Sequence, residues 1–291
     1  MKAHTTCRIV PALLTIALLP LAGTAEICLW KATSERGILY LQGSVHVLRE
    51  ADYPLDPAIE QAYAQCEALV LEADINRMEA AETQQMLLEK ARLPAGRTLE
   101  DELSTEVYSE LAGKLTAAGL SLEACQPYKP WFVTLNLMML RLEAMKLDPD
   151  LGLDRYFHRK ALADKKEEIA LESVEFQIGL FDLLSEGDQD AYILYSLKEL
   201  EQLENLLDEM LAAWKAGNLE KLDAMLSESF KDSRELEKRF VTERNKAWAK
   251  KLDELVKPEK PCMVVVGVAH FAGKEGLLEL LKARGYTVEQ L

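Results

Sequence analysis

The sequence lacks the short motifs that mark common hydrolase and nucleotide-binding sites. It contains no Gly-x-Ser-x-Gly nucleophile elbow, no His-Glu-x-x-His zinc motif, no Walker A loop and no Gly-x-Gly-x-x-Gly fingerprint. Cys-x-x-Cys spacing is also absent, which excludes thioredoxin-type redox sites and zinc ribbons. Only four histidines occur in 291 residues, so a site that needs imidazoles must draw on very few positions.

Basic residues are in short supply, with 34 Lys and Arg against 49 Asp and Glu and a formal net charge of −15. An acidic protein of this kind repels the phosphates of DNA and RNA and the headgroups of anionic lipids. We expect no nucleic-acid partner on this ground, and separately a peptide or small molecule as the substrate. The hydrophobic content of 49% is sufficient for a folded core.

Long apolar runs are confined to the first residues. Lys2 and Arg8 form a basic stretch, residues 9–21 are apolar, and the small residues 22–25 suit cleavage before Glu26. The apolar run is too short to span a bilayer, and no second long one follows. The sequence therefore predicts a signal peptide at 1–25, a single domain at 26–291, and a periplasmic or secreted protein without a membrane span.

Four cysteines follow the expected signal peptide: Cys28, Cys66, Cys125 and Cys262. In an oxidising compartment an even number permits two disulfides, with three pairings. A bridge between Cys66 and Cys262 is conceivable, and buried free thiols are an equal alternative.

Hydrophobic patterns place strands at both ends of the chain and helices between them. Six short runs are typical of strands: residues 28–31, 37–42, 68–71, 168–171, 262–267 and 286–289. Helical periodicity dominates residues 76–255, and shorter helices are expected at 57–66 and 273–283. We therefore expect an α/β fold: a mixed β-sheet built from N- and C-terminal segments, flanked by helices, with a large helical insertion at 76–255.

Two matching segments direct attention to the strand ends, where open α/β sheets form their ligand crevice. Gly43-Ser44-Val45-His46 and Gly267-Val268-Ala269-His270 each follow a strand-like run, and Glu72 and Glu172 follow two others. Taken singly, such a His is most often a capping residue and such a Glu is solvated surface. Together, two imidazoles and carboxylates suit a divalent ion such as zinc, manganese, cobalt or iron. A further carboxylate could act as general base.

A late helix carries a polar group with two interpretations. Arg244 and Trp248 share one helix face at i and i+4, and Asn245 is adjacent. They are either part of a solvated helix with a half-buried Trp, or they hydrogen-bond a substrate or an oxyanion. His158, among bulky and charged neighbours on another expected helix, is predicted to lie at the surface.

The ordered motifs resemble the TraB/GumN family, whose eukaryotic relatives are the Tiki membrane proteases. The resemblance is carried by Leu39 to His46, Val70-Leu71-Glu72-Ala73-Asp74, Lys129-Pro130-Trp131, Gly152-Leu153-Asp154, Leu171-Glu172-Ser173 with Gln177, Glu243-Arg244-Asn245 with Trp248, and Val266 to Gly276. It implies an α/β fold of the erythromycin-esterase-like class, in which the two GxxH segments meet. Phe271 stands where the family commonly has Leu, and the membrane anchor of Tiki is not expected here.

The resemblance also implies a metal-dependent hydrolase, specifically a peptidase, centred on His46, His270 and Glu72. Three further positions match the family: Glu172, Arg244 and Asn245. In this hypothesis the two histidines bind a divalent metal, and the two glutamates supply a third ligand and a general base. Arg244 and Asn245 would hold the substrate carbonyl or the developing oxyanion.

Two other classes of function are compatible with the same sequence. One is a non-catalytic accessory protein of the cell envelope that binds a metal, haem or a glycan in the same crevice. The other is an interaction protein whose acidic helical insertion recruits a partner. A variant at Glu72 separates the first alternative from an enzyme, because binding without chemistry would survive the loss of that carboxylate.

Overall fold

A computed structural model describes residues 26–182, 186–231 and 234–291. The predicted signal peptide, residues 1–25, lies outside this part of the chain. Across the described residues, no helix combines the length and the apolar character needed to cross a bilayer.

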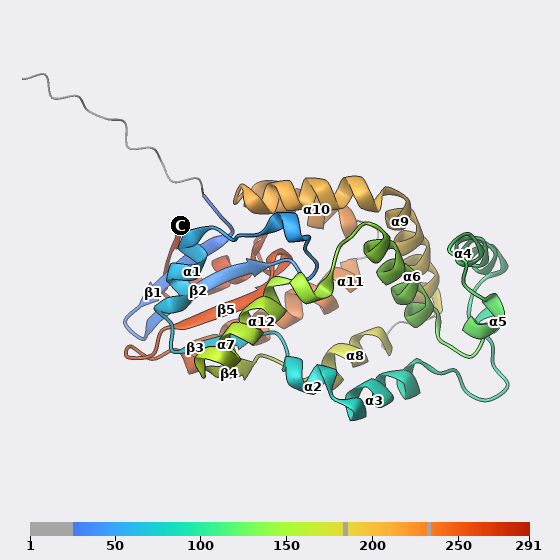
Figure 1. Cartoon of the computed structure of the whole chain (residues 1–291), viewed down its shortest axis with the longest axis horizontal. Coiled ribbons are helices and arrows are strands. Elements are labelled where there is room, and N and C mark those ends of the chain that lie inside the picture. The colour runs from blue at the N-terminus through green and yellow to red at the C-terminus, as the bar shows by residue number, and fades with distance from the viewer. Residues whose placement is uncertain (1–25, 183–185, 232–233) are drawn as a thin grey trace, which may run out of the picture.

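A six-stranded mixed sheet has the strand order β4-β3-β5-β2-β1-β6. It occupies the left half of the molecule in Figure 1. Its strands are β1 (Leu29–Ser34), β2 (Gly37–Ser44), β3 (Ala68–Leu71), β4 (Glu167–Ala170), β5 (Cys262–Gly267) and β6 (Thr287–Gln290). β4, β3, β5 and β2 are mutually parallel, whereas β1 pairs antiparallel with β2 and with β6. The prediction of an α/β fold with a mixed sheet built from both ends of the chain is confirmed.

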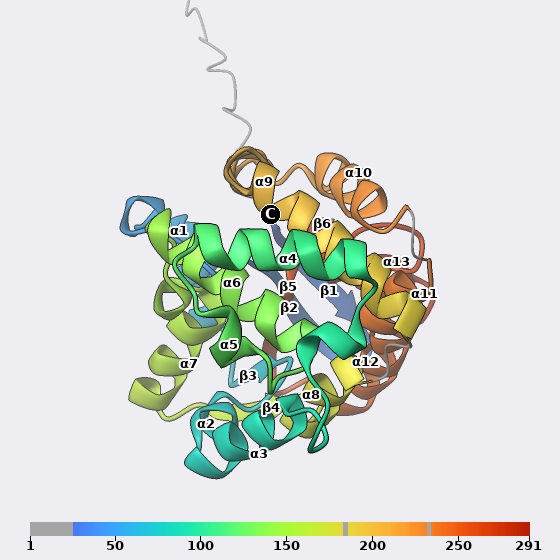
Figure 2. The same cartoon turned by 90° about the vertical axis from the view of Figure 1, so that its right-hand side faces the viewer.

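Helices cover both faces of this sheet. Figure 2 shows α1 (Pro57–Ala64) and α7 (Leu153–Asp164) on one side, and α12 (Glu243–Leu255) and α13 (Leu277–Lys282) on the other. Every residue of β3 and β5 is buried, as expected of parallel strands enclosed in this way. The short apolar runs at these positions are therefore interior strands. The polar residues that follow them in the sequence lie at the edge where these strands end.

The residues between β3 and β5 are mostly helical, interrupted by β4. Their helices, besides α7 and α12, are α2 (Ile75–Glu79), α3 (Ala81–Ala91), α4 (Thr105–Ala117), α5 (Leu122–Cys125), α6 (Pro130–Ala144), α8 (Val174–Asp182), α9 (Glu186–Lys215), α10 (Leu219–Ser229) and α11 (Arg234–Glu237). α4, α6 and α9 enclose a second, smaller core that includes Leu111, Leu137 and Ile193. This part of the chain thus buries apolar surface of its own beyond the sheet.

Two sequence-based predictions are wrong in detail. The C-terminal helix begins at Leu277 and not at Gly273, because Gly273 has a φ of +75° and Gly276 is the extended N-cap residue. A Cβ at Gly276 would lie 2.3 Å from the carbonyl oxygen of Ala272, so only glycine fits there. His158 is buried and not at the surface, because α7 packs against β4 and brings its Nδ1 to 2.8 Å from Glu168 Oε1.

The four cysteines, all within the described residues, are free thiols, so the alternative of disulfide bridges is not realised in this structure. Cys28, Cys66 and Cys262 are buried. Burial raises the pKa of Cys28 to about 12 and that of Cys66 likewise to about 12. Both thiols are therefore protonated at neutral pH and behave as small apolar side chains.

Candidate active site

The carboxyl ends of four parallel strands bring together residues that are far apart in sequence. Glu172, Glu72, His270 and His46 follow β4, β3, β5 and β2, each within three residues of the strand end. His46 Nε2 lies 4.0 Å from Glu72 Oε1, and His270 Nε2 lies 3.9 Å from the same oxygen. The two GxxH histidines therefore converge on one carboxylate.

His46 is oriented by a residue of α7. Its Nδ1 lies 2.8 Å from Asp154 Oδ2, and the Ser44 hydroxyl donates to the same oxygen at 2.6 Å. Gly152 allows this approach, since a Cβ there would stand 2.2 Å from the His46 carbonyl oxygen. The charge of Asp154 raises the pKa of His46 to about 9. The His46 side chain is 62% exposed, so solvent screens part of this attraction.

His270 is held in a comparable way but is buried. Its Nδ1 lies 2.7 Å from Asn245 Oδ1, and Asn245 Nδ2 donates to the carbonyls of His270 and Glu275 at 3.2 and 2.9 Å. An amide oxygen can only accept, so Nδ1 carries the proton and the Nε2 lone pair faces the site. Burial lowers the pKa of His270 to about 4, which keeps the ring neutral at pH 7.

Glu72 is a buried carboxylate that stays ionised. Burial by itself would raise its pKa, but the neighbouring histidines and arginine, and a hydrogen bond from the Gly267 N–H at 2.8 Å, lower it to about 2. A Cβ on Gly267 would lie 3.3 Å from both Glu72 Oε1 and His46 Nε2. The second GxxH glycine thus leaves room at the point where these side chains meet.

Arg244 lies at the centre of the strand-end edge, with 9% of its side chain exposed. Nη2 donates to Glu72 Oε2 at 2.6 Å and to Glu172 Oε1 at 2.5 Å. Nη1 donates to the Phe240 carbonyl at 3.0 Å and lies 3.3 Å from His270 Nε2. Burial by itself would lower the pKa of Arg244, but the carboxylates of Glu172 and Glu72 raise it above its ordinary value. It is a fixed cation whose N–H groups are all engaged.

The carboxylate of Glu172 accepts hydrogen bonds from three side chains. Besides Arg244, it accepts from Gln177 Nε2 at 2.9 Å and from Trp248 Nε1 at 3.0 Å. Asp154 and Gln177 had no assigned chemistry in the sequence, although both belong to segments that carry the family resemblance. Asp154 lies 108 positions from His46, so no local rule could have paired them, whereas Gln177 lies only five positions from Glu172.

An open cavity of about 330 Å³ gives access to part of this group. His46, Glu72, Asp154 and Gln177 line it, and its apolar wall is formed by Leu71, Ala73, Ile75, Met78 and Pro149. Arg155 lies at the same cavity and forms an ion pair with Glu79. The exposed His46 is therefore the imidazole that lines the cavity, whereas His270 is buried.

The side chains of His46, His270 and Glu72 are of the types that bind divalent metals, but they are not arranged as a complete set of metal ligands. Among the described residues, no three His, Cys, Asp or Glu side chains are arranged as a ready metal site. Both histidines nevertheless have Nδ1 held by an oxygen acceptor and Nε2 turned inward, as metal-ligating histidines commonly do. Glu72 adds a negative charge beside them. The Nη1 of Arg244 would have to leave His270 Nε2 before that nitrogen could bind a metal.

The parallel strand ends, the paired GxxH segments and the buried carboxylate–arginine network define an α/β protein with one polar site at the sheet edge. The chain belongs to the TraB/PrgY/gumN family, whose model matches residues 28–290. This match covers every residue of the candidate active site. Searches of curated proteins and of solved structures returned no significant match.

Proposed function

We propose that this protein is a periplasmic or secreted metal-dependent hydrolase that cleaves a peptide or related amide bond. The observation that carries the proposal is the convergence of His46 Nε2 and His270 Nε2 on Glu72 Oε1, at 4.0 and 3.9 Å. A site built only for stability would gain little from an ionised carboxylate placed between two imidazoles, because desolvating charge is costly. Such clusters of perturbed groups at an open cavity are typical of catalytic sites.

His46, His270 and Glu72 would hold the divalent ion. When bound, such an ion acts as a Lewis acid toward a carbonyl oxygen and eases the deprotonation of water. Asp154 and Asn245 fix the two rings so that Nε2 of each faces the site. In this scheme Asn245 is a positioning residue, since it is fully buried and its amide is engaged by His270 and Glu275.

Arg244 supplies a fixed positive charge beside the reacting carbonyl. Its Nη1 faces the lone pair of His270, and this N–H is released for a developing oxyanion once His270 turns to another partner. Glu172 accepts from Arg244, Gln177 and Trp248, so we assign it the task of anchoring the guanidinium. Glu72 is then the metal ligand of the two glutamates.

The proposal predicts that gently purified protein contains stoichiometric divalent metal and that the metal is needed for peptidase activity. His46→Ala and His270→Ala should each lower metal content and reduce turnover at least 100-fold. Metal is measured by elemental mass spectrometry and activity with a mixed peptide library. The matched control is His158→Gln, a buried histidine of α7 that pairs with Glu168 and with none of the proposed site residues, which should keep both. Full metal content and full activity in both site variants would refute the proposal.

Glu72→Gln distinguishes the enzyme from a binding protein of the same crevice. The amide keeps the shape of the carboxylate but removes the charge, so an enzyme loses metal and turnover together. A ligand retained with unchanged affinity, without turnover in wild type or variant, would establish the accessory role in place of hydrolysis.

One contact favours a second candidate, hydrolysis without a metal. Arg244 Nη1 lies 3.3 Å from His270 Nε2, where a metal ion would have to bind. His46, with its Nδ1 held by Asp154, is oriented as a general base would be. This route requires neutral His46, so its activity would rise as the pH passes through about 9. Activity that survives complete chelation but is lost in His46→Ala would establish this route.

A further inference from the structure

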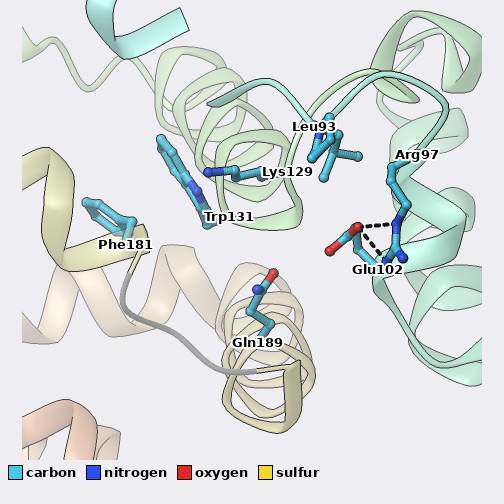
Figure 3. A pocket seen from close by; sticks show the side chains of 8 residues that line it. Leu93, Arg97, Glu102, Lys129, Trp131, Phe181 and Gln189 are labelled. Atoms are coloured by element: carbon cyan, nitrogen blue, oxygen red, sulfur yellow. Dashed lines mark hydrogen bonds and ion pairs between the residues drawn. The ribbon is translucent and has the colours of Figure 1, made fainter. Parts of the chain in front are cut away.

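Helix α6 borders one cavity at its start and another at its end. The cavity at its start, of about 260 Å³, lies against Trp131 and Phe181 (Figure 3), and none of its described lining residues borders the cavity at His46. The cavity at its end is larger, about 860 Å³, within the range of roughly 300–1,000 Å³ typical of ligand sites. It shares Pro149 with the cavity at His46. This second cavity, which we call the α6 cavity, therefore adjoins the candidate active site.

The same two stretches of backbone line the α6 cavity and the candidate active site. Leu48 and Asp148 exchange backbone hydrogen bonds, at 3.3 and 2.9 Å, and so hold the chain after β2 beside the chain before α7. His46 lines the active-site cavity, and Arg49, three residues later, lines the α6 cavity. Three residues of backbone span at most about 11 Å. A peptide segment of three or four residues is therefore long enough to reach from one cavity to the other.

The wall of the α6 cavity is apolar and partly exposed. The adjacent Met139 and Leu140 on α6 are 38% and 40% exposed, and Met145, Leu147 and Leu151 complete the wall. Neighbouring exposed apolar side chains indicate a binding surface more strongly than a single exposed leucine does. Methionine side chains also adapt to partners of different shape. The wall therefore suits a large apolar side chain.

The charged side chains of the α6 cavity favour a basic residue beside that apolar group. Three carboxylates and two cations line the cavity: Glu50, Glu143, Asp148, Arg49 and Lys146. Arg49 is already paired with Asp208, at 2.9 Å. Glu143 lies one turn beyond Met139 and Leu140 on the same face of α6, so it stands beside the apolar wall. A cationic side chain is complementary to this lining, whereas an acidic one is repelled.

We propose that the α6 cavity is a subsite for an extended peptide substrate of the candidate active site. It takes a large apolar side chain, next to a basic residue, three or four residues away from the peptide bond held at His46. The connecting residues pass over Pro149, which lines both cavities. The inference rests on the proposed peptidase function and specifies its substrate: a chain of several residues, selected by Met139, Leu140 and Glu143.

The first test measures binding to the full mature chain, freed of metal by chelation so that the probe is not cleaved. The methionine methyl groups carry ¹³C, and the Met139 signal is identified by its loss in Met139→Leu. The probe is a decapeptide amide with Lys-Phe at its centre and four glycines on either side, which reaches His46 in either chain direction. It should shift the Met139 methyl and the His46 ring signals saturably, with one affinity. Acetyl-Lys-Phe amide, too short to span both cavities, should shift the Met139 signal alone.

Calorimetry with the decapeptide tests the residues that select it. Leu140→Ala should weaken binding about threefold, because apolar surface is lost from the wall. Leu162→Ala is the matched control: it removes a leucine side chain that is 52% exposed on α7, and should leave binding unchanged. Peptides with alanine for phenylalanine, or glutamate for lysine, should bind about fivefold more weakly. Glu143→Gln should reduce the preference for lysine over glutamate. Melting temperatures verify that each variant is folded.

The outcomes separate this subsite from the proposed activity. Equal binding of the phenylalanine and alanine peptides, or no saturable shift of the Met139 signal, would overturn the subsite. If the decapeptide binds as expected but the metal-loaded protein cleaves no peptide, the α6 cavity is confirmed as a peptide-binding site and the peptidase is refuted. In an active enzyme, Leu140→Ala should raise KM about threefold and leave kcat nearly unchanged, since the lost contact binds substrate and transition state alike.

Discussion

Each histidine of the candidate site is oriented by a hydrogen bond at Nδ1, the ring nitrogen that faces away from Glu72. Asp154 holds Nδ1 of His46 and Asn245 holds Nδ1 of His270, at 2.8 and 2.7 Å. The first partner is charged and the second is neutral, and the two rings differ accordingly. The pKa of His46 is raised to about 9, and that of the buried His270 is lowered to about 4. In the metal-free protein at pH 7, one imidazole is therefore cationic and the other neutral.

Replacement of Asp154 by Asn should bring the pKa of His46 down toward its ordinary value of about 6.5. The amide preserves the shape and an acceptor oxygen but removes the charge that raises this pKa. The change is measured by following the His46 ring signals by NMR across pH in metal-free protein. Ser44→Ala is the matched control, since it removes a hydrogen bond to Asp154 and no charge. A His46 pKa that stays near 9 in Asp154→Asn would contradict the assignment.

At the level of elements, the site depends on where two helices begin. α12 starts directly after a π-helical turn, Lys238–Thr242, and such turns are frequent at functional sites. This turn places the Phe240 carbonyl 3.0 Å from Arg244 Nη1. The N-cap residue of α7, Gly152, lies against the backbone of His46, so α7 brings Asp154 to the site from its first turn.

Gly152→Ala should displace the start of α7. The new Cβ would stand 2.2 Å from the His46 carbonyl oxygen, and backbone atoms cannot rotate out of the way. We expect a loss of about 1–3 kcal/mol in the free energy of unfolding, measured by urea titration, and weaker coupling between Asp154 and His46.

The control for this change is Gly113→Ala, inside α4, where a new Cβ meets nothing within 4 Å. Alanine is the better helix former, so the free energy of unfolding should rise there by roughly 0.5–1 kcal/mol. Equal stability of Gly152→Ala and the wild type would show that α7 does not need close contact with His46.

For the molecule as a whole, the sheet joins the two ends of the described chain. β2 lies beside β5, and His46 and His270 meet because these strands are parallel neighbours. The same edge collects buried titratable groups, so stability and protonation are coupled across the fold. The acidic net charge of −15 acts separately, on solubility and on the choice of partner.

The free energy of unfolding of the metal-free protein should be highest at intermediate pH and fall toward both acid and alkaline pH. The titratable groups at the strand ends cause both declines. The folded-state pKa of His270 is lowered, so its contribution is present above about pH 6.5 and is lost as the pH falls toward 4. The lowered pKa of Glu72 extends the loss from about pH 4.5 toward 2. His46 acts in the opposite sense: its contribution is present below about pH 6.5 and is lost as the pH rises through 9.

Urea unfolding at intervals from pH 3 to 10 measures this dependence. The part due to His270 is on the order of 3 kcal/mol at most, from a pKa that falls from 6.5 to about 4. Asp154→Asn should remove most of the alkaline decline and leave the acid one. A stability that is constant from pH 7 down to 4 would contradict a neutral, buried His270.

Much of the fold could be predicted because its signals are local. The apolar runs before His46, Glu72 and His270 identified three interior strands, since a strand buried on both faces needs a continuous hydrophobic sequence. The start of the last helix was wrong, because the positive φ of Gly273 depends on contacts that lie outside any local pattern.

The sequence by itself determined which residues end the strands, and therefore that two histidines and two glutamates would lie at strand ends. Tertiary structure alone decided their partners. Arg244 meets Glu72 across 172 positions, and Asp154 meets His46 across 108, because packing of α12 and α7 brings them there. Hydrogen bonds act over about 3 Å. Periodic patterns reveal which way a side chain points, whereas the group it meets is fixed only when distant elements pack.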